Sequence, residues 1–260
     1  MRLREDDQIE VCDGRGTVAR CSIVNISNRV SCSVEKKNFL AFSGVQWKLC
    51  VASGSIKGQR GDWLVEKATE LGAFSFQPLL TDHSPRIGGG GGGGKSQSRR
   101  RAKRRGTALG DEAEGDAGGG SGSGREERWG RLAVAASKQC LRSHFLEISP
   151  PVQLDALLRE AAADDASNGA TCGVFAAHQS GLPLMSLENR GAFEESLVTP
   201  GAKRTGLLIV GPEGDFSQRE LRLMEESGVR MVGLGDLRLR VETAALALLS
   251  GMRMMEQGSF

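Results

Sequence analysis

The spacing of apolar and polar residues divides the chain into two parts. In the first 44 residues, apolar and polar positions alternate in short runs at 9–12, 17–24 and 30–34, and the sequence Asp-Gly-Arg-Gly joins the first two runs. Alternation with a period of two, interrupted by Gly and Asp, is typical of antiparallel strands joined by hairpins. We therefore expect a small antiparallel β-barrel over residues 1–44.

From residue 45 onward the pattern changes to strands that alternate with helices. Short apolar runs predict strands over residues 47–51, 74–80, 171–177, 207–210 and 230–234. Apolar residues at helical spacing predict helices over residues 62–71, 125–142, 155–163 and 242–255. This alternation favours a parallel sheet, because parallel neighbours need a crossover connection. The predicted fold class is therefore α/β.

Two loops that contain glycine follow strands in the last quarter of the chain. Residues 211–216 (Gly-Pro-Glu-Gly-Asp-Phe) follow one predicted strand, and residues 235–240 follow the next. Ser217 has the position of a helix N-cap, and Glu220 completes a capping box. Because the carboxyl ends of parallel strands meet at one edge of a sheet, the two loops predict a ligand-binding crevice.

Residues 87–124 have the composition of a disordered segment. Seven consecutive glycines, a basic cluster at 99–105, an acidic patch and a Gly/Ser tract cannot bury enough apolar surface to offset the entropy of ordering. We predict a disordered insert in one surface loop. Its basic cluster either binds RNA phosphates or acts as a localisation signal, and an inert insertion is the alternative.

The net charge of +2 does not by itself indicate a protein that binds nucleic acid. Residues 86–124 hold eight Lys and Arg against four acidic residues, so the remainder of the chain has a charge of −2. Any binding site for RNA must therefore arise from local clustering of positive charge.

Residue types and hydropathy bear on the compartment of the protein, on metal binding and on membrane insertion. The six cysteines are scattered without a CxxC pair, which favours a reducing compartment over a zinc site or a disulfide framework. The histidines (His83, His144 and His178) lie far apart, so we expect no bound metal. No run is long enough to cross a membrane. We expect a cytoplasmic-type soluble protein, or a chloroplast or mitochondrial one if a targeting segment is missing before the abrupt start at Met1.

Four ordered blocks of sequence resemble the RsmE family of methyltransferases. The first is Gly-Pro-Glu-Gly-x-Phe-Ser-x-x-Glu from residue 211, and the second is Leu-Gly at 234 with Leu-Arg-x-Glu-Thr-Ala from 239. The others are Lys-Ala-Thr-Glu-Leu-Gly at 67–72 and Ala-Ala-Ser-Lys-Gln-Cys-Leu-Arg at 135–142. The resemblance extends over nearly the whole chain except the insert.

The resemblance implies a fold and an activity. RsmE proteins are SPOUT-class enzymes that use S-adenosylmethionine to methylate N3 of a uridine in small-subunit (16S-type) ribosomal RNA. By resemblance, residues 45–260 form a SPOUT trefoil-knotted methyltransferase domain, and residues 1–44 form a PUA-like β-barrel that binds RNA. The implied partners are small-subunit ribosomal RNA or the assembled small subunit, and a second copy of the chain in a homodimer that shares its active site.

The resemblance also implies which residues bind the cofactor. The two glycine loops form two walls of the site, and the end of the strand at 171–177 forms a third side. The cofactor-binding residues are Gly211, Pro212, Glu213, Gly214, Leu234, Gly235, Leu239 and Ala177. Ordinary turn chemistry is the alternative for the glycines.

Three residues are predicted to act on the uridine. N3 must lose its proton, and the resulting anion is delocalised onto O2 and O4, so a nearby cation stabilises it. Arg240 is predicted to orient or stabilise the uridine, and Arg142 to hold a phosphate or a base. Glu242 either accepts the proton or caps the last helix. Glu213, one of the cofactor-binding residues, is either a base or an organiser of its loop.

Two positions depart from the family pattern. Asp215 stands where a second glycine is more common, which puts a positive φ at this position in doubt. Leu237 stands where many relatives have Arg. Because plant relatives look similar at both positions, we interpret them as traits of a plant/algal-like subgroup.

Two alternative functions stay open. One is a catalytically inactive SPOUT-fold factor that binds RNA or assists ribosome assembly, and the other is a SPOUT methyltransferase with another RNA target. A phosphate-binding α/β domain is disfavoured, because no P-loop motif follows any predicted strand.

Overall fold

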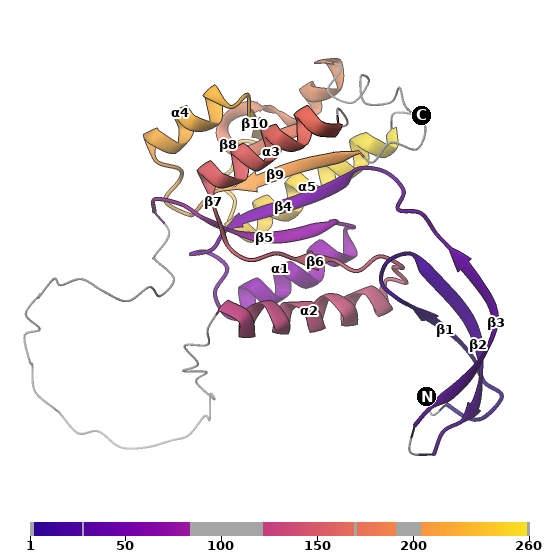
Figure 1. Cartoon of the computed structure of the whole chain (residues 1–260). Coiled ribbons are helices and arrows are strands. Elements are labelled where there is room, and N and C mark those ends of the chain that lie inside the picture. The colour runs from indigo at the N-terminus through magenta and orange to yellow at the C-terminus, as the bar shows by residue number, and fades with distance from the viewer. Residues whose placement is uncertain (1–2, 28, 84–121, 169–170, 191–203, 259–260) are drawn as a thin grey trace, which may run out of the picture.

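The computed structural model describes residues 3–27, 29–83, 122–168, 171–190 and 204–258 (Figure 1). These residues form two separate β-sheets, and the second sheet has helices on both faces. The predicted insert at 87–124 lies outside the described residues, except for its last residues, which begin helix α2.

The first sheet is antiparallel and consists of β1 (Gln8–Cys12), β2 (Thr17–Asn25) and β3 (Ser31–Phe39), in that order. In Figure 1 it extends away from the rest of the molecule. The predicted antiparallel pairing is confirmed. Within the described residues β1 and β3 both remain edge strands, and three strands are too few to close on themselves. Within the described residues the sheet is therefore open, and of the β-barrel expected over residues 1–44 the structure contains these three antiparallel strands.

The second sheet is parallel, with the order β10-β8-β9-β4-β5-β6 and with β7 paired to β5. Its strands are β4 (Gln46–Ala52), β5 (Ser75–Leu80), β6 (Glu147–Ile148), β7 (Val152–Gln153), β8 (Thr171–Pro183), β9 (Thr205–Val210) and β10 (Arg230–Gly233). The helices are α1 (Gln59–Glu70), α2 (Gly122–Gln139), α3 (Leu154–Asn168), the 3₁₀ helix η1 (Leu184–Arg190), α4 (Gln218–Glu226) and α5 (Val241–Gly258). The predicted parallel α/β fold is confirmed.

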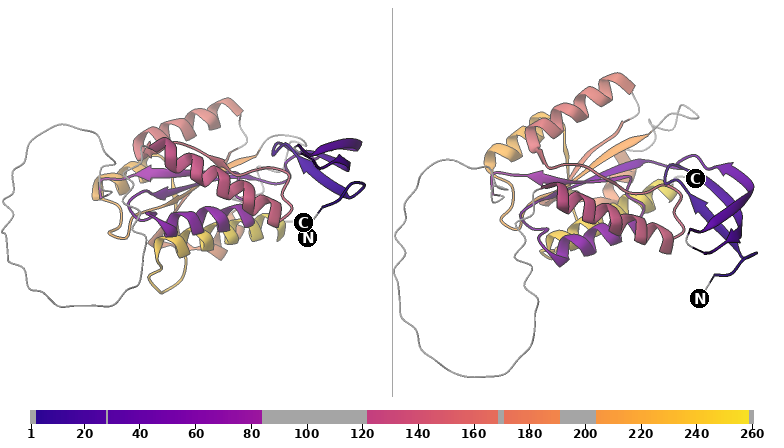
Figure 2. Two further views of the ribbon diagram at one scale, coloured as in Figure 1. Left: turned by 90° about the horizontal axis from the view of Figure 1, so that it is seen from below. Right: turned by 60° about the horizontal axis from the view of Figure 1, so that its bottom comes forward.

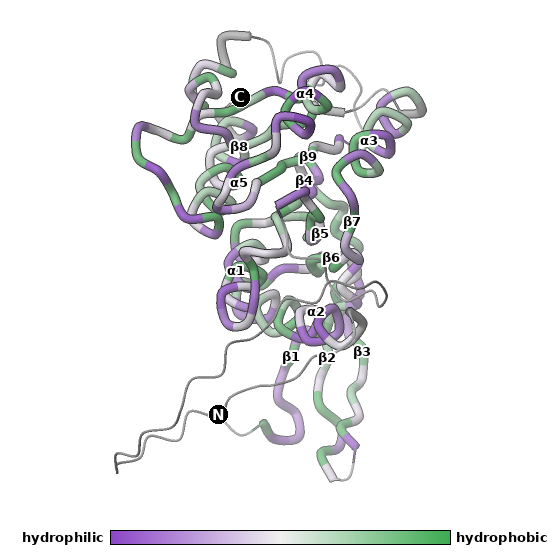
Figure 3. The backbone as a smooth tube through the Cα atoms, turned by 90° about the vertical axis from the view of Figure 1, so that its left-hand side faces the viewer, coloured by the Kyte–Doolittle hydropathy of each residue, from purple (hydrophilic) through white to green (hydrophobic). Residues whose placement is uncertain are grey.

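The central strand β4 contributes to an apolar core on each face of this sheet. Leu49 and Val51 pack in the cluster that contains α1, α2 and α5, whereas Cys50 packs with α3 and α4 on the other face. Figure 2 shows these helices on the two sides of the sheet. In Figure 3, hydrophobic residues (green) are frequent along the central strands, whereas α4 has many hydrophilic ones (purple). Because side chains on both faces of the central strands are buried, these strands have continuous apolar sequences instead of alternating ones.

Several element boundaries differ from the predicted ones. Helix α1 begins at Gln59 and ends as expected, with Gly72 just beyond it at a φ of 85°. Helix α2 covers Gly122–Gln139 and not 125–142, while α3 and β8 extend beyond their predicted ends. Strands β6 and β7 have two residues each and were not predicted, because such short strands show no periodicity.

Helix α4 begins at the predicted capping box. Ser217 Oγ accepts the backbone N–H of Glu220 at 3.2 Å, and Glu220 Oε2 accepts the backbone N–H of Ser217 at 2.9 Å. Glu220 is buried, and its Oε1 accepts the backbone N–H of Asp82 at 2.9 Å. The Asp82 carboxylate accepts hydrogen bonds from Ser217 Oγ at 2.6 Å and Arg219 Nη2 at 2.7 Å. The start of α4 is therefore fixed to the end of β5.

Glu256 ties the start of β4 to the last turns of α5. Its side chain is only 5% exposed. Oε1 accepts the backbone N–H of Val45, and Oε2 accepts hydrogen bonds from Trp47 Nε1 at 3.2 Å and Arg253 Nη1 at 3.0 Å. Trp47 is fully buried, with its ring centroid 6.0 Å from that of Phe175 in an edge-on arrangement. Several donors therefore compensate the cost of burying this carboxylate.

We expect Glu256→Ala to lower the free energy of unfolding by about 3 kcal/mol, because it leaves two buried N–H donors and one guanidinium without their acceptor. Glu256→Gln keeps an acceptor oxygen and should cost less. Exposed Glu226→Ala is the control and should change stability by no more than about 0.5 kcal/mol. Urea unfolding measures the stability of all three variants. A Glu256→Ala variant as stable as wild type would contradict this account.

Hydrogen bonds from Arg219 and Ser217 lower the pKa of Asp82 from its ordinary value of 3.8. A carboxyl whose pKa is lower in the folded state stabilises the fold above its unfolded pKa, and this contribution is lost as the pH falls through the folded pKa. We therefore expect Asp82→Asn to be less stable than wild type at neutral pH. The difference should shrink as the pH falls below 3.8. Urea midpoints across a pH series test this, and a difference independent of pH would refute it.

Candidate active site

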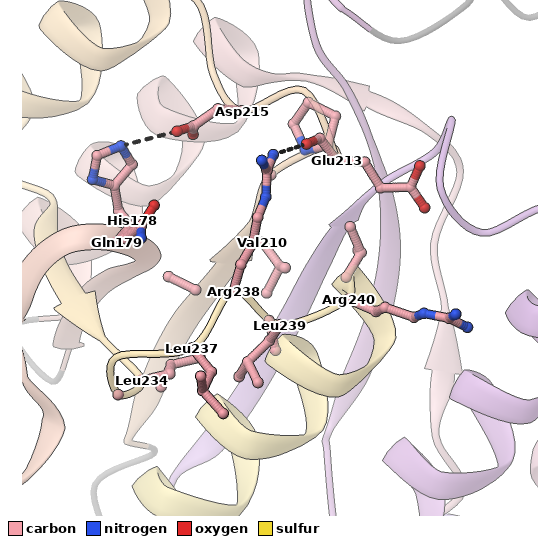
Figure 4. A pocket seen from close by; sticks show the side chains of 16 residues that line it. His178, Gln179, Val210, Glu213, Asp215, Leu234, Leu237, Arg238, Leu239 and Arg240 are labelled. Atoms are coloured by element: carbon pink, nitrogen blue, oxygen red, sulfur yellow. Dashed lines mark hydrogen bonds and ion pairs between the residues drawn. The ribbon is translucent and has the colours of Figure 1, made fainter.

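A cavity of about 680 Å³ lies at the carboxyl ends of β9 and β10, beside residues 177–179 of β8 (Figure 4). Residues of β8, of the loop after β9 and of the loop between β10 and α5 line it. Of the predicted cofactor-binding residues, those that line the cavity are Ala177, Gly211, Pro212, Glu213, Leu234, Gly235 and Leu239. Arg240 also lines it, whereas Gly214 does not, although it belongs to the same turn as Glu213. The fold therefore brings the two glycine loops together.

The loop after β9 is a tight turn. The backbone N–H of Asp215 donates to the carbonyl of Pro212 at 2.9 Å, and Asp215 has a φ of 68°. The sequence put a positive φ at this position in doubt, but Asp tolerates the left-handed region better than most residues. The Oδ1 atom of Asp215 also accepts the N–H of Phe216 at 2.8 Å. Gly211 is needed for space, since a Cβ there would lie 2.7 Å from the Phe216 ring.

The loop after β10 lies against the first loop. The guanidinium of Arg238 donates to the backbone carbonyl of Glu213. The Glu213 carboxylate pairs with Arg60 of α1 at 3.0 Å, so these contacts organise its loop. Gly235 has a φ of 111° in the bend that follows β10. Leu237, which departs from the family pattern, is 81% exposed.

Arg240 lies at the end of this loop, directly before α5. It is exposed, and its carbonyl accepts the N–H of Ala244 in the first turn of the helix. Its side chain points away from the side of the cavity formed by His178 and Asp215 (Figure 4). Arg240 belongs to none of the ion pairs found among the described residues. Its charge is therefore available to a ligand.

The third side of the cavity is a bulge in β8. The pairing of β8 with β10 shifts before Val232, so residues 177–181 have no partner on β10. Gly181 allows the strand to return, because a Cβ there would lie 2.5 Å from the backbone of Val232. His178 and Gln179 of the bulge line the cavity but were not among the predicted site residues. The sequence ended this strand at residue 177 and gave no sign of the bulge other than the glycine.

Arg142 lies outside this cavity. Its Nη1 and Nη2 donate to the carbonyls of Thr69 and Ala73 at 2.9 and 2.5 Å, so the guanidinium caps the carboxyl end of α1. Burial lowers the pKa of Arg142 to about 10. The residue lines a second cavity, of about 610 Å³, together with Leu141 and Met254. Within one chain, the structure does not bring Arg142 and Arg240 into one site.

Glu242 lies in the first turn of α5, where a negative charge interacts favourably with the helix N-terminus. Its side chain is buried, and its Oε2 has no hydrogen-bond partner among the described residues. Glu242 is not part of the cavity lining. The position suits a helix cap, and the role of proton acceptor stays a prediction.

In the described parts of the chain, no group of His, Cys, Asp and Glu side chains is arranged to hold a metal ion. The helices in those parts are all too short or too polar to cross a membrane. Among the cysteines, Cys21, Cys50 and Cys172 are buried, and Cys12, Cys32 and Cys140 are exposed.

Two protein-family models match the chain. The RNA methyltransferase domain matches residues 45–103 and 113–253, and the RNA methyltransferase PUA domain matches residues 1–36. Among curated proteins, ribosomal RNA small subunit methyltransferase E of Bacillus subtilis is 28% identical over 272 residues, which cover 97% of this chain and 83% of the relative. The protein of the same name from Synechocystis is 23% identical and covers 96% and 67%, respectively.

Two solved structures share the fold. A probable rRNA methyltransferase from Porphyromonas gingivalis gives a TM-score of 0.69 at 21% identity, over 100% of this chain and 89% of that one. Ribosomal RNA small subunit methyltransferase E from Neisseria gonorrhoeae, bound to S-adenosyl methionine, gives 0.68 at 18% identity, over 97% and 84%. Because the domain model matches well over half of the chain, this protein belongs to the RNA methyltransferase family, and its resemblance to the RsmE family is confirmed.

Proposed function

We propose that this protein uses S-adenosylmethionine to methylate N3 of a uridine in small-subunit ribosomal RNA. The observation that carries the proposal is the meeting of both glycine loops and Arg240 in one cavity at the carboxyl ends of parallel strands. The family supports an RNA methyltransferase, and the names of the curated relatives support the small-subunit RNA as substrate.

The cavity fits S-adenosylmethionine in size and in chemistry. Its volume of about 680 Å³ lies in the usual range for small-molecule sites. Leu234, Leu239 and Val210 provide an apolar side for the adenosine, and the turn after β9 and Gly235 bring backbone close to the cavity. When bound, the cofactor supplies a methyl group activated by its sulfonium. The residues of the chain mainly position the two reactants.

Arg240 is the proposed partner of the uridine. N3 becomes nucleophilic when it loses its proton, and the negative charge then spreads onto O2 and O4. The exposed Arg240 guanidinium, which has no carboxylate partner among the described residues, is free to donate to one of these oxygens. Glu242 is proposed either to accept the N3 proton or to cap α5.

The active site is proposed to be shared in a homodimer that brings Arg142 of one chain near Arg240 of the other. The second cavity, beside Arg142, carries apolar side chains that water covers in the single chain: Leu141 is 89% exposed and Met254 is 69% exposed. A second copy of the chain that packs here would bury them. The trefoil knot and binding of RNA by the first sheet are parts of the same proposal.

Calorimetric titration with S-adenosylhomocysteine, together with nucleoside mass spectrometry of small-subunit RNA, tests the activity. We expect the wild type to bind the ligand and to form N3-methyluridine. Arg240→Ala should bind the ligand but methylate about 100-fold more slowly, because it loses a cation that acts on the uridine anion. Arg222→Ala, an exposed arginine outside the cavity, is the matched control and should behave as wild type.

Each contrary outcome of this experiment has its own meaning. If the wild type binds no S-adenosylhomocysteine, the inactive RNA-binding or assembly factor replaces the proposal. If a nucleoside other than N3-methyluridine forms, the chain is a methyltransferase with another RNA target.

Co-expression of Arg142→Ala with Arg240→Ala tests the shared site. Each variant alone should be nearly inactive. Random pairing makes half of the dimers mixed, and each mixed dimer has one intact site, so we expect about a quarter of wild-type activity. Because Arg142 also caps α1, the thermal midpoint of its variant is measured alongside. No recovery of activity by folded mixed dimers would refute the shared site.

A further inference from the structure

The polar side of the cavity is built around Asp215 and His178. The Oδ2 atom of Asp215 lies 3.4 Å from Nε2 of His178, so the turn after β9 meets the bulge of β8 across the cavity (Figure 4). The backbone carbonyl of Asp215 accepts a hydrogen bond from His83 Nδ1 at 2.9 Å. Asp215 therefore stands between two chain segments that come from different strands.

The contacts of His178 fix which ring nitrogen carries the proton. Its Nδ1 accepts the backbone N–H of Ser180 at 3.2 Å and lies 2.8 Å from Ser180 Oγ. Because a backbone N–H can only donate, Nδ1 is the acceptor and the proton lies on Nε2, which faces Asp215. The N–H edge of the imidazole thus lies 3.4 Å from the carboxylate, and the attraction between them favours this placement of Asp215.

Asp215 differs from the other carboxylate that lines the cavity. Glu213 pairs with Arg60 at 3.0 Å, and its side chain points away from His178 in Figure 4. Asp215 has no Lys or Arg partner among the described residues, and its side chain is 54% exposed. Its carboxylate therefore keeps acceptor positions that are free for a cationic ligand.

The backbone at Asp215 supports a role for the side chain. A φ of 68° is a conformation that glycine adopts without strain, whereas any residue with a Cβ does so at some cost. Strain of this kind is concentrated at sites where a side chain has a function.

We propose that the Asp215 carboxylate, oriented by His178, binds the α-ammonium group of S-adenosylmethionine; this rests on the function proposed above. The cofactor has an adenosine at one end and an amino acid at the other. The cavity likewise has the leucines at one side and the Asp215–His178 pair at the other (Figure 4). The ammonium group has three N–H donors, whereas the sulfonium has none, so the ammonium is the cation that a carboxylate can hydrogen-bond.

The test compares two ligands by calorimetry. S-adenosylhomocysteine carries the ammonium group, and 5′-methylthioadenosine has the same adenosine and a thioether but no amino acid. We expect Asp215→Asn to raise the dissociation constant of S-adenosylhomocysteine about tenfold, because one charge-assisted hydrogen bond is lost. The dissociation constant of 5′-methylthioadenosine should not change. Asp215→Gly should give the same result, and since Gly and Asn both tolerate positive φ, the fold is kept.

Asp236→Asn is the matched control, because Asp236 is an exposed acid in the loop after β10 that does not line the cavity. Its variant should bind both ligands like the wild type. If the Asp215 variants lose the same affinity for both ligands, Asp215 has a purely structural role and the proposal is overturned. If the variants bind both ligands with wild-type affinity, the proposal is also overturned. If the wild-type protein binds neither ligand, the proposed function is itself refuted, and with it the inference that rests on it.

Discussion

The buried carboxylate of Glu220 is the interaction on which the geometry of the cavity depends. Each of its oxygens accepts a backbone N–H, one from Ser217 and one from Asp82. Through these two bonds, the start of α4 is attached to the end of β5, and the turn at 211–215 is held between β9 and a fixed point. Arg238 and His178 contact that turn from the other two sides.

Charged groups in this molecule divide into two kinds according to whether the fold supplies their partners. The side chains of Glu220 and Glu256 are buried, and their donors come from the backbone and from neighbouring side chains. Arg240 and Asp215 lie at the cavity, and the described residues give neither of them a partner of full opposite charge. The paired charges of Glu220 and Glu256 stabilise the fold, whereas the charges of Arg240 and Asp215 are available to ligands. Arg240 and Asp215 lie on opposite sides of the cavity (Figure 4).

The features that the sequence predicted correctly are those encoded over a short span. The capping box at Ser217, the glycine after α1 and the buried parallel strands each depend on residues a few positions apart. The meeting of the two glycine loops also followed, because parallel neighbouring strands must end at one edge.

The features that the sequence did not predict depend on distant partners. The bulge in β8 exists only in relation to the register of β10, and the pairing of His178 with Asp215 depends on that bulge. Arg142 was placed near the RNA by resemblance, but its hydrogen bonds to the end of α1 depend on how α2 packs against that helix. The positive φ of Asp215 occurs in a turn closed by its N–H and the carbonyl of Pro212, which the residue type alone does not predict.

The contact between Glu256 and the start of β4 has a consequence for the order of folding. Val45 and Glu256 are 211 positions apart, and β4 is the strand on which β5 and β9 both assemble. During synthesis β4 is made long before Glu256, the residue that accepts the backbone N–H of Val45 and the indole N–H of Trp47. Contacts of such long range form late and slow the search for the native state. Until α5 is available to dock, one face of the sheet therefore lacks part of its apolar core.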